Sequence, residues 1–407
     1  MSRLLRYTLS HAPWMLISSL SHGVSNYIII ILLAKFYGLA AGGQFRLLLS
    51  IVSLLSIFTL LDSGKVVIRH LVMQRPGVVR PLLVARVLGA FAGLGIGVVA
   101  ATVFHWKGDE LWLPVLMASL LLPVTYPPDL YAQVNQAKKQ FRLNALYNVA
   151  RYSTLTLLVL VLALRWFDVM SIFAIYFIVF AAFNIFYLVL CQEAYEPSNP
   201  DGKVFVKETV QLSGSGVFPI ILENADKIMI SYFLGLEALG LYAIGVSTGK
   251  ILLNLIKPAL TIYFPLLVNR RVDASILLRL FVALSAIGLT TAVLMKYYFA
   301  HVLGAEYLNA YPVAAVIVGG LGLYFVGVIS YYSSVYHKDS TIIIPSLTNI
   351  ISSLVVASYL LVAILWGGEH VLLLCAASYP LRELIKMSII AILSRKVEPN
   401  AKPGVVL

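Results

Sequence analysis

The sequence predicts an all-α integral membrane protein of about twelve transmembrane helices, arranged as two six-helix halves. Of its 407 residues, 60% are hydrophobic and 12% are charged. A soluble domain has roughly 45–50% apolar and about 25% charged residues, so a soluble fold could not bury this much apolar surface. The apolar residues also form repeated segments near the length of about 20 residues that crosses a bilayer. A short motif recurs at the same place in both halves, which indicates that the chain is a duplicated unit.

The transmembrane helices are predicted one by one from the apolar segments. Lys and Arg cluster in alternate connections, and the positive-inside rule places these connections, with both termini, in the cytoplasm. The external connections are short, so we expect no separate catalytic domain there. The predicted spans are 13–34, 43–62, 82–104, 111–134, 145–165, 169–191, 212–235, 238–266, 276–300, 312–335, 342–366 and 370–393.

Several classes of function are disfavoured. The net charge of +12 comes from short clusters between apolar runs, which is a topology signal and not a nucleic-acid signature. Cys191 and Cys375 fall at opposite membrane faces, so we expect no disulfide between them. The G-x-S-x-G pattern at Gly245–Gly249 lies inside an apolar helix, where a hydrolase elbow cannot form. No Walker A or zinc-protease motif occurs, and we expect no metal or other cofactor.

An internal repeat relates the two halves. The stretch AKFYGLAAGGQF (Ala34 to Phe45) follows the first span, and SYFLGLEALGLY (Ser231 to Tyr242) follows the seventh. Matching residues are separated by 197 positions: Gly38 and Gly235, Leu39 and Leu236, Gly43 and Gly240, Phe45 and Tyr242. Six spans per half give both halves the same orientation, so residues 1–197 and 198–407 form a parallel repeat with a binding site expected between them.

Span eight carries a polar stripe. Lys250, Asn254, Lys257 and Thr261 recur at i, i+4, i+7 and i+11, on one face of one helix. Lys250 lies roughly 16 Å from the outer end at 1.5 Å per residue, near the midplane. Because a buried charge is costly in a bilayer, we expect Lys250 to line a cavity. For Lys257 two interpretations stay open, a cavity position and snorkelling to the inner interface.

Spans one, two and seven carry further polar groups. Glu223 and Lys227 form an i,i+4 pair that either fixes helix packing or places a protonatable group beside a cation, and Asp226 lies between them. His22 and Asn26 in span one are candidates to line water, whereas the nearby serines favour helix contacts. Arg46, one turn into span two, either lines the cavity or contacts a lipid headgroup.

These four spans are equivalent pairs under the repeat, so a cationic, water-filled lumen lined by spans one, two, seven and eight is the simplest interpretation. Such a lumen suits an anionic passenger. Outside this set, Arg86 and Arg151 are expected to snorkel to the cytoplasmic interface. Arg382, Glu383 and Lys386 in span twelve are expected near the inner interface, with the interior of the second half as the alternative.

The second copy of the repeat resembles a known family. Asp226-Lys227-Ile228 followed by Leu234–Tyr242 is similar to the start of the second half in Wzx-type O-antigen and polysaccharide flippases of the multidrug/oligosaccharidyl-lipid/polysaccharide superfamily. The first-half Gly38, Gly43 and Phe45, and the stretch Leu303–Tyr307 with Ala310, resemble the corresponding elements there. The sequence departs from the pattern at Gln44 and Arg46, which flank the aromatic residue.

The resemblance implies a fold like that of the multidrug extruders and a defined activity. A flippase would move an undecaprenyl-diphosphate-linked oligosaccharide, such as an O-antigen unit of lipopolysaccharide, from the cytoplasmic to the periplasmic leaflet of the bacterial inner membrane. Fixed cations suit a diphosphate; Arg46, Lys227, Lys250 and Lys257 would supply them, with Glu223 or Asp226 carrying a coupling proton. Partners would be this substrate, membrane lipid, and a glycan polymerase with its chain-length regulator. A multidrug extruder and, on weaker grounds, a membrane glycan polymerase are the alternatives.

Overall fold

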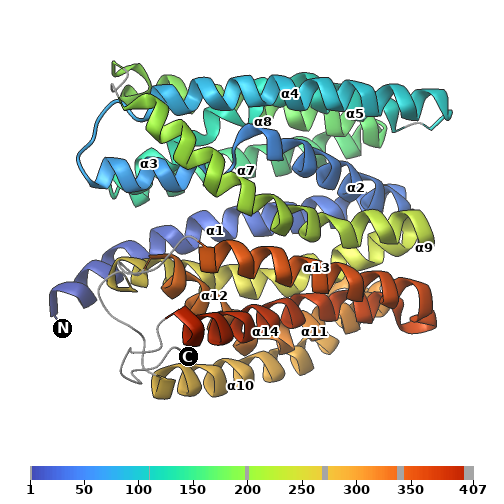
Figure 1. The fold of residues 1–407 in the computed structure, drawn as a ribbon. Coiled ribbons are helices and arrows are strands. Elements are labelled where there is room, and N and C mark those ends of the chain that lie inside the picture. Colours follow the sequence, from blue (N-terminus) through green and yellow to red (C-terminus); the bar gives the residue numbers. More distant parts are fainter. Residues whose placement is uncertain (1, 110, 198–200, 268–273, 337–342, 398–407) are drawn as a thin grey trace. The chain divides into compact units, whose positions relative to one another are not determined.

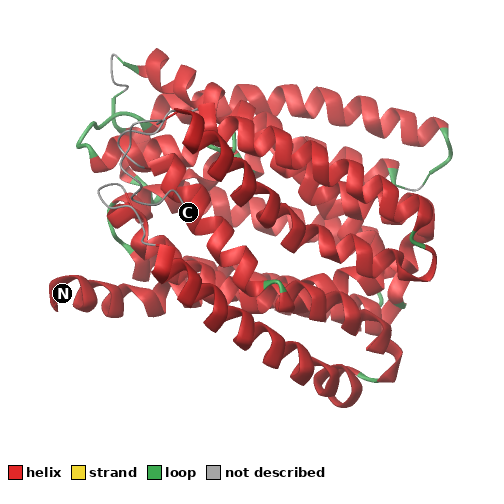
Figure 2. Ribbon diagram, turned by 60° about the horizontal axis from the view of Figure 1, so that its bottom comes forward, coloured by secondary structure: helices red, strands yellow, loops and turns green. Residues whose placement is uncertain are grey.

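A computed structural model describes residues 2–109, 111–197, 201–267, 274–336 and 343–397. These residues form helices joined by short loops, and no strand occurs among them (Figure 2). Two compact units can be recognised: residues 28–228, and residues 1–27 together with 229–407. Their boundaries cut through the helices α1 (Ser2–Tyr37) and α9 (Gly202–Leu267). This division differs from the two sequence halves, so the boundary between residues 197 and 198 stays a prediction.

Most of the helices match the predicted spans in length and apolar character. Eight helices in the described part of the chain are long and apolar enough to cross a membrane, and the number is ten if each of two bent pairs is one span. In addition, α9 covers both the seventh and the eighth predicted spans. It consists of two helices joined at a kink, because the backbone at Gly235 has non-helical dihedral angles (φ 88°, ψ 175°). The twelfth predicted span corresponds in position to α14 (Val371–Val397), which is not among these eight helices or the two bent pairs.

The unit of residues 28–228 packs around an apolar core. Phe45 on α2 stands edge-on to Phe173 and Tyr176, with ring centroids 5.8 and 5.7 Å apart. On α4, Gly93 lets a neighbour approach closely, since a Cβ there would lie 2.6 Å from Leu122 Cδ2. The elements are α2 (Leu39–Leu55), η1 (Ser56–Thr59), α3 (Ser63–Val72), α4 (Val79–Trp106), α5 (Trp112–Thr125), η2 (Pro127–Leu130), α6 (Tyr131–Ala137), α7 (Phe141–Leu164), α8 (Val169–Val189), η3 (Gln192–Tyr195) and the first part of α9 (Figure 1).

The other unit contains the first part of α1, the remainder of α9 and the C-terminal helices. Its helix α14 packs against α11, α12 and α13. The close approach of α14 to the second bent pair depends on Gly320, where a Cβ would lie 2.7 Å from Pro380 Cβ. The elements are α10 (Ala274–Tyr298), the π-turn η4 (Phe299–Leu303), η5 (Ala305–Ala310), α11 (Tyr311–Gly319), α12 (Leu321–Tyr336), α13 (Ile343–Trp366), η6 (Gly368–His370) and α14.

Both bent pairs occupy the same place in the repeat. The fourth predicted span consists of α5 and, beyond Pro127, η2 with α6, and it bends by 40°. The tenth predicted span bends by 44° between α11 and α12. Pro127 and Pro128 break the first because proline lacks the backbone N–H and clashes with the preceding turn, whereas Gly319 and Gly320 mark the second break. Spans four and ten, six spans apart, are therefore both broken.

Candidate functional site

Lys227 and Asp226 form a buried ion pair inside the unit of residues 28–228. Their side chains are 1% and 2% exposed, and Lys227 Nζ lies 2.7 Å from Asp226 Oδ1. The same ammonium donates to the backbone carbonyl of Glu223, one helical turn earlier. Asp226 is thus a direct carboxylate partner of Lys227, and the charge of Glu223, the i,i+4 neighbour expected from the sequence, acts on Lys227 as well. Two ions taken out of water this completely need each other, because either alone would be an uncompensated buried charge.

The surroundings of this pair connect α9 with α2. Asn224 donates to Ser53 Oγ on α2 at 3.1 Å and to the Ile220 carbonyl at 2.8 Å. Arg46, also on α2, is half-buried, and its positive charge acts on Lys227. The structure therefore brings together three predicted residues, Arg46, Asp226 and Lys227, within one unit. Glu223 is exposed on the same helix.

Lys250 lies on the second part of α9, in the other unit. Its Nζ is 4.6 Å from the ring centroid of Tyr379 on α14, a cation–π contact, and the side chain is half-buried. An ammonium held over an aromatic face keeps its charge while its hydration shell is partly removed. Lys250 is therefore a cation that an anionic group could approach. The side chain of Lys257, two turns further along α9, lies outside the described residues.

Asn254 faces α1 within that unit. Its backbone carbonyl accepts a hydrogen bond from Ser19 Oγ at 3.1 Å, and a Cβ at Gly23 would lie 2.8 Å from Asn254 Nδ2. On α1, His22 Nε2 and Asn26 Nδ2 are 3.0 Å apart. His22 is exposed and Asn26 half-buried, whereas Asn254 packs against the small residues of α1. The sequence stripe of Lys250 and Asn254 thus contacts two different helices, α14 and α1.

The polar residues of α14 correct one prediction. Glu383 and Lys386 were expected near the inner interface, but both are buried among the helices of their unit. Lys386 Nζ donates to Glu383 Oε1 at 2.9 Å and lies 5.4 Å from the ring centroid of Tyr331. Gly327 on α12 makes room for Glu383, since a Cβ there would lie 2.8 Å from Oε2. Whether a side chain is buried depends on the face of the helix that carries it. The distance of a residue from the end of the helix does not reveal that face.

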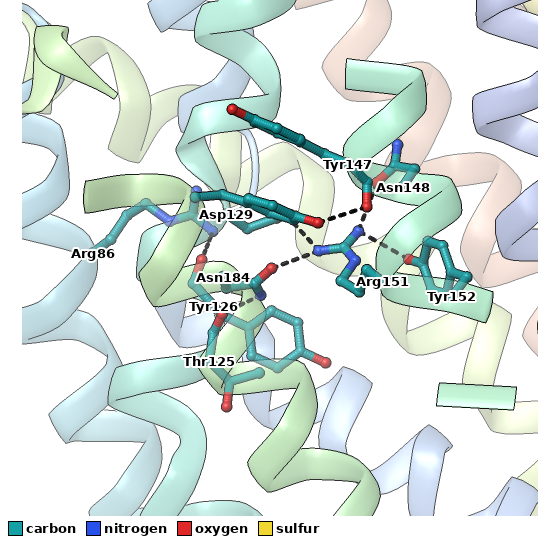
Figure 3. A network of polar contacts seen from close by, with 10 residues as sticks. Arg86, Thr125, Tyr126, Asp129, Tyr147, Asn148, Arg151, Tyr152 and Asn184 are labelled. Atoms are coloured by element: carbon teal, nitrogen blue, oxygen red, sulfur yellow. Dashed lines mark hydrogen bonds and ion pairs between the residues drawn. The ribbon is translucent and has the colours of Figure 1, made fainter. Parts of the chain in front are cut away.

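A second correction concerns Arg86 and Arg151, which were expected to snorkel. They are 3% and 5% exposed and belong to a buried polar network (Figure 3). Arg151 on α7 donates from Nη1 to Asn184 Oδ1 at 2.5 Å, and from Nη2 to Asn148 Oδ1 at 2.9 Å and Tyr152 at 3.2 Å. Its guanidinium also lies 4.7 Å from the ring centroids of Tyr152 and Phe180.

The broken fourth span anchors this network. The helix breaks at Pro127 and Pro128, because proline has no backbone N–H, and the carbonyls just before the break accept hydrogen bonds from side chains. Asn184 Nδ2 donates to the Thr125 carbonyl at 2.7 Å, and Arg86 Nη2 donates to the Tyr126 carbonyl at 2.8 Å (Figure 3). Irregular backbone inside a membrane protein is tolerated where such partners satisfy it. The two arginines therefore stabilise the break in span four.

Asp129 brings a carboxylate to the same network. It follows the two prolines in η2, and its Oδ1 lies 3.6 Å from Arg151 Nη1. Its side chain is 37% exposed, although the surrounding residues are buried. An ionised group inside a membrane span faces water or protein and not lipid. Sequence analysis missed Asp129, and the signal that could have found it is the proline pair next to an acidic residue within an apolar segment.

Each unit thus supplies fixed cations and amide groups on helices of membrane-spanning length, and such groups suit binding of an anionic, hydroxyl-rich ligand. Within the described ranges, no three His, Cys, Asp or Glu side chains gather closely enough to hold a metal ion. Cys191 and Cys375 are both buried, and neither forms a disulfide.

Comparison with known families decides the membership of the chain. The model of the family described as polysaccharide biosynthesis protein matches residues 13–270, well over half of the sequence. The chain belongs to this family. This family falls within the multidrug/oligosaccharidyl-lipid/polysaccharide superfamily, which is the superfamily that the repeat motifs indicated. No protein of curated function matches it.

Solved structures show the fold of this family member. A variant of the Vibrio cholerae MATE transporter VcmN superposes with a TM-score of 0.65 at 11% identity, covering 98% of each chain. The inward-facing conformation of a multidrug resistance MATE transporter of the superfamily superposes with a TM-score of 0.59 at 11% identity. The match covers 97% of this chain and 98% of that one. A MATE in complex with MaL6 superposes with a TM-score of 0.60 at 10% identity. The match covers 96% of this chain and 95% of that one. The protein is thus a multi-pass membrane protein with the MATE-like fold that the sequence predicted.

Proposed function

We propose that this chain is a flippase for an undecaprenyl-diphosphate-linked oligosaccharide, such as an O-antigen repeat unit. The family match over residues 13–270 carries the proposal, because family and fold both point to a transporter or flippase and the family is one of polysaccharide biosynthesis. The substrate would move from the cytoplasmic to the periplasmic leaflet of a bacterial inner membrane, with both termini of the protein in the cytoplasm. The polyprenyl tail would remain in lipid throughout.

Three cations, one buried and two half-buried, support this proposal chemically. A diphosphate requires several fixed positive groups, and Lys227, Lys250 and Arg46 are cations within helices that otherwise consist largely of apolar residues. His22, Asn26, Asn254 and Lys257 complete the proposed polar lining. Alternating access would expose this lining to one side of the membrane and then to the other. Glu223 or Asp226 would carry the coupling proton. Asp226 would do so by exchanging its contact with Lys227 for the proton.

A lysine substitution tests the substrate path. Lys250→Ala should abolish export of the lipid-linked glycan and leave membrane insertion intact, because it removes a cation and its contact with the Tyr379 ring from a helix that otherwise keeps its apolar residues. Lys296→Ala is the matched control, since Lys296 is an exposed lysine on α10 of the same unit. Glycan export is measured by surface staining, and lipid-linked units retained inside the cell by extraction. Normal export by a well-inserted Lys250→Ala protein would remove Lys250 from the path.

A multidrug extruder is the second candidate, because the superposed structures include multidrug resistance transporters. A deletion strain separates the two functions. A flippase defect predicts accumulation of lipid-linked oligosaccharide at the inner leaflet, which would in turn deprive a glycan polymerase and its chain-length regulator of substrate. Increased sensitivity to cationic drugs, with normal surface glycan, would favour the extruder.

A further inference from the structure

Short helix α6 and the helix α7 that follows it each carry a buried polar pair along their contact. Tyr131 and Asn135 are four residues apart on one face of α6, and Asn144 and Arg151 are seven apart on one face of α7. The two helices pack against each other, and the rings of Tyr131 and Tyr147 lie 6.0 Å apart across the contact. We call the contact between these two faces the α6–α7 seam.

Each of the four residues in the seam is more than nine-tenths buried and has a polar atom with no hydrogen-bond partner in the described structure. The atoms are Tyr131 Oη, Asn135 Nδ2, Asn144 Oδ1 and Arg151 Nε. Native proteins pair nearly all such buried groups with protein atoms or with ordered water. Four such atoms along one helix contact therefore indicate a common partner and not four independent defects.

The chemistry of the four atoms matches water. Asn135 Nδ2 and Arg151 Nε only donate, Asn144 Oδ1 only accepts, and the Tyr131 hydroxyl does both. A buried water molecule requires two to four such partners, of both kinds. An anion would lack donors beside Asn144, and a cation would lie beside the Arg151 guanidinium. Water is the ligand that can satisfy every one of these atoms.

The seam also has two polar ends. At one end is the turn between α6 and α7, where Lys138 and Lys139 are exposed. At the other is the Asp129–Arg151 pair at the break in span four, whose charges act on Tyr131. We propose that ordered water occupies the α6–α7 seam and connects this turn with the Asp129 carboxylate. The inner end of span four is thereby hydrated from within a single unit, independently of any substrate lumen.

Hydroxyl-radical footprinting of the full-length protein in nanodiscs tests the proposal, because radicals generated from bound water label adjacent side chains even when these are buried. Tyr131 should be oxidised several-fold faster than Phe173, a fully buried aromatic residue in the apolar core of the same unit. Oxidation is quantified by mass spectrometry of the corresponding peptides. Equal rates at Tyr131 and Phe173 would overturn the proposal.

A double substitution, Asn135→Leu with Asn144→Leu, supplies the second arm. It replaces both amides by apolar side chains, so Tyr131 oxidation should fall to the rate at Phe173, while Phe173 itself is unchanged. Undiminished oxidation of Tyr131 in the folded double variant would contradict a seam filled with water. Where the double variant does not fold, the comparison of Tyr131 with Phe173 in the unaltered protein decides. Neither arm involves glycan export, so its outcome is separate from that of the flippase proposal.

Discussion

Gly38 and Gly235 have the same left-handed backbone conformation at equivalent points of the repeat. Gly38 has φ 89° and ψ 166°, and Gly235 has φ 88° and ψ 175°. Gly38 separates α1 from α2, and Gly235 divides α9 between the seventh and eighth predicted spans. Only glycine adopts this region without strain, because any side chain would clash with the backbone. The repeat therefore extends from sequence letters to backbone dihedral angles.

Replacing either glycine should be costly in the same way. Gly38→Ala and Gly235→Ala should each lower the free energy of unfolding by about 1–3 kcal/mol, since alanine is strained at these dihedral angles. Thermal unfolding in detergent measures the effect. Gly95→Ala is the control, because Gly95 lies inside α4 with no atom within 4 Å of an added Cβ and no positive φ. A loss at Gly95 as large as that at Gly235 would show that the dihedral angle is not the cause.

The Arg151 network should be essential for the stability of its unit. Arg151→Gln removes the partner of Asn184, Asn148 and Asp129, and we expect a loss of about 3–5 kcal/mol, as for a broken buried ion pair. Arg151→Lys should recover only part of this, because an ammonium cannot reproduce the planar fork. Arg142→Gln, at an exposed position of α7, should stay within about 0.5 kcal/mol of the unaltered protein. Melting temperatures of the purified variants provide the comparison.

The Asp226–Lys227 pair should show strong coupling in a double-mutant cycle. Asp226→Ala leaves the Lys227 charge buried without its carboxylate and should cost about 3–5 kcal/mol. The double variant with Lys227→Met removes both charges and should recover most of that loss. Stability and glycan export are measured on all four proteins. Additive losses of stability in the double variant would indicate that the two side chains do not depend on each other. If the double variant recovers export together with stability, the pair has only a structural role.

Asp168, outside the membrane-spanning segments, should make a small pH-dependent contribution to stability. It caps α8 by accepting from Ser171 Oγ at 2.6 Å and from the Ser171 backbone N–H at 3.0 Å. These hydrogen bonds hold the pKa of the Asp168 carboxyl below its ordinary value. A carboxyl with a lower pKa in the folded state stabilises the fold above the unfolded-state pKa of about 3.9, and the contribution disappears as the pH falls through the folded-state pKa.

Two substitutions separate the cap from its charge. Asp168→Ala should lose roughly 0.5 kcal/mol or somewhat more at neutral pH, at the low end for an N-cap because the residue is largely exposed. Asp168→Asn should retain most of the cap and lose only the acid-dependent part. Melting curves between neutral and acid pH test both expectations. The same acid dependence in Asp168→Asn as in the unaltered protein would assign it to another group.

Composition, apolar length and loop charge determined the fold class, because a bilayer imposes its thickness and its charge asymmetry on any chain that crosses it. The 197-residue spacing of Gly38 and Gly235 likewise predicted the repeat, since a backbone that only glycine can adopt leaves a mark in the sequence. The same local logic failed for Arg86 and Arg151. Their closeness to helix ends suggested snorkelling. Position along a helix, however, contains no information on which neighbour each side chain faces.

Tertiary structure alone decided those contacts. Arg86 is buried where it donates to the Tyr126 carbonyl at the break in span four, and Arg151 is buried beside Asn184 and Asp129, each over 20 residues away in the sequence. Lys227 pairs with its sequence neighbour Asp226, a partner that helical spacing does not predict, because both side chains are buried together in their unit. Such pairings depend on long-range packing in a low-dielectric interior, where an unpaired polar group is costly, and a single sequence does not encode them in any local pattern.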